Sequence, residues 1–141
     1  MKIILLLLTL LFNNTNKETT ASTAHNSNYI AGVSFGSMCC GPSSDQFLKD
    51  YVKKFNKKYT IKITADKFGG CGREGEFIIL FPLSKIKKTT QMQFINGMGK
   101  LLQAQELKNK KIKPNSGGFQ LLRNIKEEEY SHCRIGKTKW I

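Results

Sequence analysis

The sequence predicts a single α+β domain with four strands and two amphipathic helices. Three segments show either the period-two alternation of a half-buried strand or the unbroken apolar run of a fully buried one. Two longer segments carry apolar residues at helical spacing. A length of 141 residues suits one domain, and 40% hydrophobic with 23% charged residues is typical of globular proteins. This composition excludes a disordered tail, a coiled coil and a multi-span membrane protein.

The chain begins with the pattern of a secretory signal peptide, which we predict over residues 1–24. Lys2 precedes an apolar run over residues 3–12, and small residues follow at Ala21 and Ala24, where cleavage is expected. The run has about half of the roughly 20 residues that a membrane-spanning helix needs. The alternative interpretation is a buried N-terminal helix, but the run shows no amphipathic pattern.

Cleavage would leave an exported and strongly basic chain. The whole sequence has 23 Lys and Arg against 10 Asp and Glu, a net charge of +13, and losing Lys2, Lys17 and Glu18 leaves +12. No second hydrophobic span follows, so no membrane span is expected after cleavage. We predict a secreted or periplasmic protein. Its parts are a short flexible N-terminus at 25–28, a domain at 29–125 and a C-terminal tail at 126–141 that packs back on the domain.

The first strand and the first helix are predicted from alternation and from helical spacing. Residues 29–37 alternate, which places Tyr29 on the same face as Ala31, Val33 and Phe35. Ser43 and Gln46 then have the spacing of a capping box. A helical stripe of apolar residues follows, formed by Phe47, Leu48, Tyr51, Val52, Phe55 and Tyr59.

The remaining elements are two strands, a helix and a last strand. Residues 60–66 alternate and predict an edge strand, and the Gly-rich residues 68–75 predict a turn. Residues 76–83 are almost continuously apolar and predict a buried strand. A helix is expected over residues 90–110, although Gly97 and Gly99 lie inside it, and a strand over residues 119–125.

The resulting order, strand–helix–strand–strand–helix–strand, is that of the ferredoxin-like split fold. We therefore predict a ferredoxin-like βαββαβ fold, with an antiparallel four-stranded sheet in the order 4-1-3-2 and both helices on one face. Trp140 and Ile141 end the tail as an apolar pair that could fold back onto the sheet.

Four cysteines in an exported chain predict that disulfides staple this fold. The candidates are Cys39, Cys40, Cys71 and Cys133. Adjacent cysteines seldom pair with each other, because the small ring strains the peptide bond. We therefore expect Cys39 and Cys40 each to pair with one of Cys71 and Cys133, which leaves two pairings open. Each bridge would stabilise the fold by roughly 3–5 kcal/mol.

The predicted topology also brings the cysteine loops to one end of the sheet. The end of the first strand, the turn between the second and third strands and the start of the fourth strand meet there. A second hypothesis follows, in which Cys39, Cys40 and Cys71 form a thiol-dependent metal or redox site. A soft ion such as copper or zinc would suit such ligands.

A short motif bears on this second hypothesis. Residues 36–40 read Gly-Ser-Met-Cys-Cys, at the place after the first strand where heavy-metal-associated domains carry Gly-Met-x-Cys-x-x-Cys. The segment resembles that motif over five residues and lacks the two-residue gap that lets both thiolates face one ion. The function of that family is therefore not carried over, and a redox Cys-x-x-Cys is absent too.

Charge suggests a partner class. The lysines that lie largely off the apolar stripe of the first helix are Lys49, Lys53, Lys54, Lys57 and Lys58. They predict either a solvated helix face, which we favour, or an anion-binding surface, so the expected partner is an unknown protein or an anionic surface. RNA-recognition modules share the predicted fold, but export and the excess of lysine over arginine argue against a nucleic-acid partner.

Catalysis has little support in the sequence, and we assign no catalytic residue. The histidines are His25, beside the predicted cleavage site, and His132, whose pairing with Cys133 would require a free thiol. The acidic run at residues 127–129 has no evident acid–base partner. We therefore expect a binding or structural role without a cofactor. The thiol-dependent metal-binding or redox protein remains the alternative.

Overall fold

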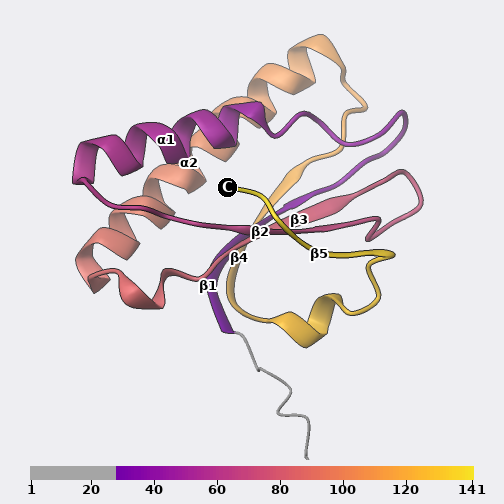
Figure 1. Ribbon diagram of the computed structural model, residues 1–141. Helices are drawn as coiled ribbons and strands as arrows, with labels where there is room; N and C mark the ends of the chain where they lie inside the picture. Colours follow the sequence, from indigo (N-terminus) through magenta and orange to yellow (C-terminus); the bar gives the residue numbers. More distant parts are fainter. Residues whose placement is uncertain (1–27) are drawn as a thin grey trace, which may run out of the picture.

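The computed structural model describes residues 28–141, so the predicted signal peptide and residues 25–27 of the predicted flexible N-terminus lie outside the described part. Two helices cover one face of an antiparallel sheet of order β4-β1-β3-β2-β5 (Figure 1). The elements are β1 (Asn28–Phe35), α1 (Gln46–Tyr59), β2 (Asp66–Gly69), β3 (Phe77–Phe81), η1 (Leu83–Lys85), α2 (Lys88–Ile112), β4 (Phe119–Lys126), η2 (Glu127–Tyr130) and β5 (Ile135–Lys139). None of the helices within residues 28–141 is long and apolar enough to cross a membrane.

Within residues 28–141 the sheet has five strands, where the sequence predicts four. The additional strand, β5, pairs antiparallel with β2, from Asp66 opposite Lys139 to Gly69 opposite Ile135. All five residues of β5 are exposed, so the strand has no apolar alternation that a sequence pattern could detect. As a result β2, which was predicted at the edge of the sheet, lies inside it.

The second strand also begins later than predicted. Ile63 and Ala65 are buried, as the alternation over residues 60–66 predicts, but their segment lies outside the strands. The Ile63 N–H donates to the Asn56 side chain at 2.9 Å, which ties the segment to α1. The strand therefore forms at Asp66–Gly69, partly within the predicted turn.

The main core lies between the two helices and the sheet. Phe94 of α2 stands at its centre, with ring centroids 5.1 Å from Phe55 of α1 and 5.2 Å from Phe81 of β3. Fully burying a side chain of this size stabilises the fold by about 1.5–3 kcal/mol. The other fully buried members of this core include Val33, Phe35, Leu48, Val52, Ile79 and Met98.

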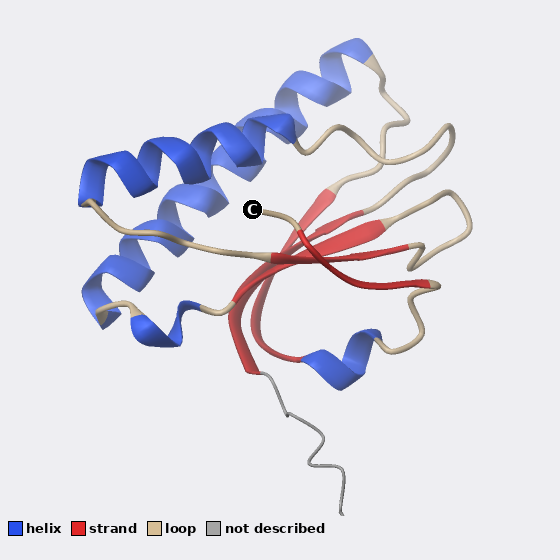
Figure 2. Ribbon diagram, in the orientation of Figure 1, coloured by secondary structure: helices blue, strands red, loops and turns tan. Residues whose placement is uncertain are grey.

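A second apolar cluster covers the opposite face of the sheet. Figure 2 shows the short η2 helix and the turn after it on this face, away from α1 and α2. The cluster consists of Tyr29, Phe68, Ile78, Leu80, Ile125 and Cys133. The C-terminal segment therefore partly covers the face of the sheet that α1 and α2 leave uncovered.

Tyr29 belongs to this second cluster, and not to the helix-facing set in which the alternation placed it. The pairing of β1 with β4 skips Ile30 and Asn124, and Asn124 has φ +51°. This irregularity sits beside Tyr29, whose hydroxyl donates to Asp66 at 2.8 Å. Burial, together with that bond and the charges of Asp66 and Glu127, raises the pKa of Tyr29, so the hydroxyl stays a proton donor.

Replacing either of the two glycines inside α2 with alanine should change the stability of the fold, in opposite directions for Gly97 and Gly99. A methyl group on Gly97 would overlap the Tyr51 hydroxyl, which donates to the Phe94 carbonyl at 2.7 Å. A methyl group on Gly99 would make an ordinary contact with Leu121 at 3.5 Å. We expect Gly97→Ala to lower the free energy of unfolding by about 1–3 kcal/mol, and Gly99→Ala to raise it by up to about 1 kcal/mol. Urea denaturation of both variants is the check, and a stabilised Gly97→Ala would contradict this helix packing.

Candidate functional site

The loops that the topology predicts to converge do meet at one end of the sheet. The Gly36 N–H donates to the Gly118 carbonyl at 3.0 Å, which joins the segment after β1 to the segment before β4. A Cβ on Gly117 would overlap the Gly36 carbonyl, so this close approach of two backbones requires glycine there. The β2–β3 turn is near as well, because a Cβ on Gly41 would contact the Glu74 carbonyl oxygen at 3.8 Å.

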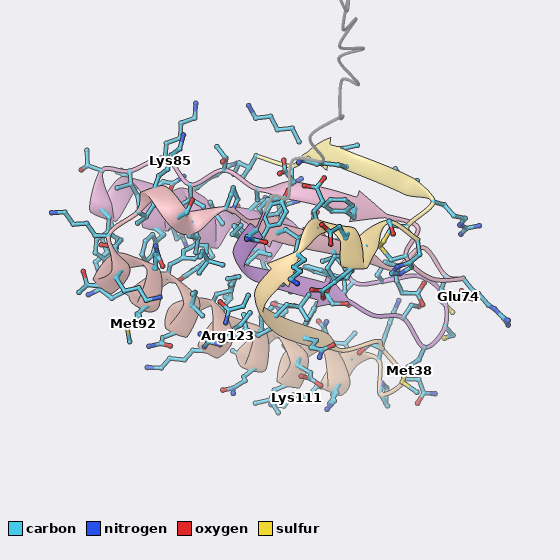
Figure 3. All side chains as sticks on the ribbon, turned by 90° about the horizontal axis from the view of Figure 1, so that it is seen from below. Met38, Glu74, Lys85, Met92, Lys111 and Arg123 are labelled. Carbon is cyan, nitrogen blue, oxygen red and sulfur yellow. A yellow bond between two sulfur atoms is a disulfide. The ribbon has the colours of Figure 1, made fainter. Side chains whose placement is uncertain are left out.

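These loops border a hollow of about 420 Å³. Its walls are residues 39–43 and residues 112–116. The lining is partly apolar, because it includes Ile112, which is 69% exposed. Met38, next to Cys39 in the sequence, is 71% exposed. Figure 3 places Met38 and Glu74 at this end of the molecule. We call this feature the cysteine hollow.

Cys39 and Cys40 are free and exposed at the mouth of the cysteine hollow. Their sulfur atoms lie 3.0 Å apart. Cys40 has φ +70° and Gly41 has φ +84°, so the loop turns through two left-handed residues in succession. The hydrogen bond with Cys40 raises the pKa of the Cys39 thiol, and nearby Glu74 adds to this effect while Lys113 opposes it.

The predicted disulfide pairing is wrong. Cys71 pairs with Cys133, across 62 residues of sequence, and neither bonds to Cys39 or Cys40. The reason is the fifth strand: β5 runs beside β2, which brings the turn before β5 against the turn after β2. The Arg134 N–H donates to the Gly70 carbonyl at 3.2 Å next to the bridge.

The pairing also removes a ligand from the alternative metal site. Cys71 carries no thiol, so the three-cysteine site of Cys39, Cys40 and Cys71 does not form in this structure. No group of three or more His, Cys, Asp or Glu side chains within residues 28–141 is placed to hold a metal ion. Of the three cysteines in the thiol hypothesis, Cys39 and Cys40 still have free thiols.

The candidates for acid–base work have structural contacts. A thiolate pair of His132 with Cys133 does not form, because Cys133 is in the disulfide and His132 is exposed with Nδ1 3.1 Å from the Glu129 carbonyl. Glu127 accepts hydrogen bonds from Lys137 at 3.0 Å and from Tyr29 at 3.4 Å. These side chains tie η2 to the sheet.

The predicted anion-surface lysines of α1 separate into two groups. Lys49 lies 3.7 Å from Asp45 and 5.6 Å from the centre of the Trp140 ring, so it belongs to the contacts of the C-terminal tail. Lys53, Lys54, Lys57 and Lys58 are exposed along the rest of the helix. Of these, Lys54 and Lys58 border a hollow of about 280 Å³ between α1 and α2.

Another hollow, of about 560 Å³, shares Tyr59 with this one as a lining residue. Its charged residues are Lys62, Lys85 and Lys87, and Tyr59, Ile61, Ile86 and Thr90 complete its walls. Among residues 28–141, no aspartate or glutamate lines either hollow. We call the two hollows together with Lys54, Lys58, Lys62, Lys85 and Lys87 the lysine end.

The lysine end is built on a rigid support. Gln91 is buried, and its Nε2 donates to the carbonyls of Leu83 and Ile86 at 2.8 Å each, which fastens the η1 segment to α2. The ring of Tyr59 packs on Phe55 with centroids 4.3 Å apart. Burial raises the pKa of Tyr51 to about 12, so its hydroxyl remains the donor that joins α1 to α2.

Sequence reasoning found the lysines of α1 and missed the three that come from other segments. A signal was present, because no acidic residue occurs between Asp50 and Asp66 or between Glu76 and Glu106. These two acid-free stretches contain every residue of the lysine end. Only the fold shows that they lie side by side.

Within residues 28–141, the fold and these two sites define a small, basic α+β protein with the Cys71–Cys133 disulfide, the cysteine hollow and the lysine end. Comparison of the chain with protein-family models, curated proteins and solved structures finds no significant match.

Proposed function

We propose that this protein is an exported binding domain for anionic ligands, and that the lysine end is its binding site. The ligands it suits are phosphate or sulfate esters with more than one negative charge. Lysine offers a mobile point charge, not the rigid fork of arginine, so the proposal is for charge recognition and not for one fixed bidentate geometry.

One observation carries the proposal: five lysines border two adjacent hollows that no carboxylate lines. None of the five takes part in the ion pairs found within residues 28–141, whereas Lys49, Lys67, Lys110 and Lys137 do. Like charges held near one another raise the energy of the folded state, and a bound anion relieves that repulsion. The lysines are exposed, so their charges remain hydrated and available.

The start of α2 adds to the attraction. The helix begins at Lys88 with no acidic residue in its first turn and no side-chain cap. Its first amide groups and the positive end of its dipole therefore remain open to an anion beside Thr90. The apolar walls at Ile61 and Ile86 would contact the body of the ligand that carries the charges.

The proposed location and fold type accord with this role. We infer that residues 1–24 direct export and that the domain is a ferredoxin-like fold extended by β5. The Cys71–Cys133 bridge supports an oxidising location, since such bonds persist outside the reducing cytosol. The strand order β4-β1-β3-β2 supports the ferredoxin-like assignment.

Removing the charges of the second hollow should weaken anion binding. We expect the triple variant Lys62→Gln, Lys85→Gln, Lys87→Gln to raise the Kd for tripolyphosphate at least about threefold, since each of the three exposed ion pairs contributes roughly 0.2–1 kcal/mol. Isothermal titration calorimetry at low ionic strength measures this.

The matched control removes three exposed lysines of α2 that lie outside the lysine end. The variant Lys100→Gln, Lys108→Gln, Lys111→Gln has the same net charge, and its Kd should change less than twofold. Equal weakening in both variants would show that net charge alone attracts the anion, which would contradict a site at the lysine end.

A further inference from the structure

We propose that Cys39 and Cys40 form a thiol–disulfide exchange site whose substrates are low-molecular-weight disulfides that carry carboxylates. This site is separate from the lysine end and does not depend on the anion-binding proposal. It uses the two cysteines that the Cys71–Cys133 bridge leaves free.

Cys39 and Cys40 lie close together and are both open to solvent. The two sulfur atoms lie 3.0 Å apart, close enough to bond after a small movement of either side chain, and both residues are exposed. One cysteine could therefore attack a substrate disulfide that enters the cysteine hollow. The other cysteine could then attack the resulting mixed disulfide and release the rest of the substrate. The hollow, at about 420 Å³, has room for a small peptide-like disulfide.

The chemistry of adjacent cysteines makes the bond reversible. A disulfide between neighbouring residues closes a small ring that departs from relaxed geometry, and strained or exposed disulfides are reduced more easily than buried ones. The positive φ angles of Cys40 and Gly41 already bend the loop away from an extended path. Cys40 is not a glycine, so this conformation carries strain that the surrounding loop sustains.

The other bridge shows the contrast. Cys133 is 7% exposed and belongs to the apolar cluster under the sheet, where it holds η2 and β5 in place. That environment suits a permanent structural bond. Cys39 and Cys40 stand in solvent at the mouth of a hollow and hold no element of the sheet in place.

The exchange balances without a further reactant. The Cys40 thiolate attacks one sulfur of R–S–S–R, which forms a mixed disulfide and releases the first thiolate, R–S⁻, which takes up a proton. The Cys39 sulfur, after losing its proton to water, attacks the Cys40 sulfur and releases the second R–S⁻. The two cysteines lose two electrons and two protons, and the substrate becomes two R–SH molecules.

The hollow also indicates which disulfides are preferred. Lys113 lines it and acts on the charge of Cys39, so it can attract a carboxylate on the substrate. Glu74 lies near the same sulfur and acts in the opposite sense. The apolar rim at Ile112 and Pro114 would contact the carbon chain of the substrate.

The first test measures the redox state of the pair in the whole protein. The protein is equilibrated with glutathione and glutathione disulfide at a series of ratios, alkylated with N-ethylmaleimide and digested without reduction. Mass spectrometry should find the peptide with Cys39 and Cys40 either doubly alkylated or as an internal disulfide two mass units below the dithiol. Cys71–Cys133 should stay bonded throughout. A pair that stays doubly alkylated at every ratio would overturn the proposal.

A single-cysteine variant tests the resolving step. Cys39→Ser retains the attacking thiol without its partner, so it should hold at least tenfold more mixed disulfide with glutathione than the unmodified protein. Equal amounts in the two proteins would overturn the proposal, because they would show two independent surface thiols. Circular dichroism confirms that the exposed substitution leaves the fold intact.

Substrate preference is tested with two disulfides of opposite charge. Lys113→Gln should slow the reaction with glutathione disulfide at least threefold more than the reaction with cystamine, which carries no carboxylate. Lys111→Gln, two residues away in the sequence and outside the lining of the hollow, is the matched control and should slow neither. If Lys113→Gln slows both disulfides equally, carboxylate recognition is wrong.

Discussion

Removing the Cys71–Cys133 bridge should lower the free energy of unfolding by about 4 kcal/mol, the largest effect that we expect from any change of a side-chain pair in this protein. The bridge closes a segment of 62 residues, and the chain-entropy relation gives this value for a loop of that length. A loss of this size is a large part of the 5–15 kcal/mol that stabilises a typical domain.

The double variant Cys71→Ala, Cys133→Ala tests this in urea denaturation. Amide hydrogen exchange should accelerate first in η2 and β5, because the bridge fastens these elements to the β2–β3 turn. The matched control is Cys39→Ala, Cys40→Ala, which removes two exposed residues and should change stability by less than about 0.5 kcal/mol. A loss below 1 kcal/mol in the first variant would contradict the structural role of the bridge.

Replacing Asp45 with alanine should cost about 2–3 kcal/mol at neutral pH, because its carboxylate anchors the end of the chain. Asp45 precedes α1 and accepts a hydrogen bond from Trp140 Nε1 at 2.8 Å, while Lys67 lies 3.3 Å and Lys49 lies 3.7 Å from it. Hydrogen bonds to a charged group contribute about 1.5–3 kcal/mol. The Ser43–Gln46 capping box predicted here is absent, since the helix begins after Asp45 without a side-chain cap.

The effect should depend on pH in a defined direction. Burial acts to raise the pKa of Asp45, but the Trp140 bond and the lysine charges outweigh it and hold the pKa below its ordinary value. A carboxylate with a lowered folded-state pKa stabilises the fold fully above its unfolded-state pKa, near 4, and loses this contribution as the pH falls through the folded-state value.

The stability difference between the unmodified protein and Asp45→Ala should therefore be constant from pH 7 to about 5 and shrink below about pH 4. Urea denaturation at pH 7 and pH 3 measures both. Asp50→Ala is the matched control, because Asp50 is an exposed acid of the same helix and should contribute less than about 1 kcal/mol. A difference that grows in acid would contradict the anchoring role.

Much of the fold could be predicted from periodicity. The helix over Phe47–Tyr59 is found at Gln46–Tyr59, and the apolar run at 76–83 contains β3. Both patterns reflect burial against one partner, which leaves a clear signature in the sequence. β5 has no buried face and depends on backbone pairing with β2 and on the nearby disulfide, so no pattern in Ile135–Lys139 could reveal it.

The errors at Tyr29 and at the cysteines have a shared cause in tertiary contacts. Tyr29 lies beside an irregularity of the β1–β4 ladder that arises at Asn124, far away in the sequence. The cysteine pairing followed from the position of the unforeseen strand. In both cases a residue or strand distant in the sequence determines the structure, and the local sequence pattern does not show where that residue or strand lies.

The candidate sites divide in the same way. The meeting of the cysteine loops follows from the order of the strands alone and was therefore predictable. The lysine end draws on α1, on the segment after it and on the residues around η1, so it requires the packing of α1 against α2. Acid-free stretches indicated these segments, but their adjacency is a property of the fold.

The central claim, that the positive charge is concentrated into a binding site at the lysine end, is tested most directly by titrating ¹⁵N-labelled protein with tripolyphosphate and following the amide resonances. The shifts should be largest for residues 54–62 and 85–93 and should saturate with a single Kd. Shifts spread over all exposed lysines, or largest around the cysteine hollow, would contradict it.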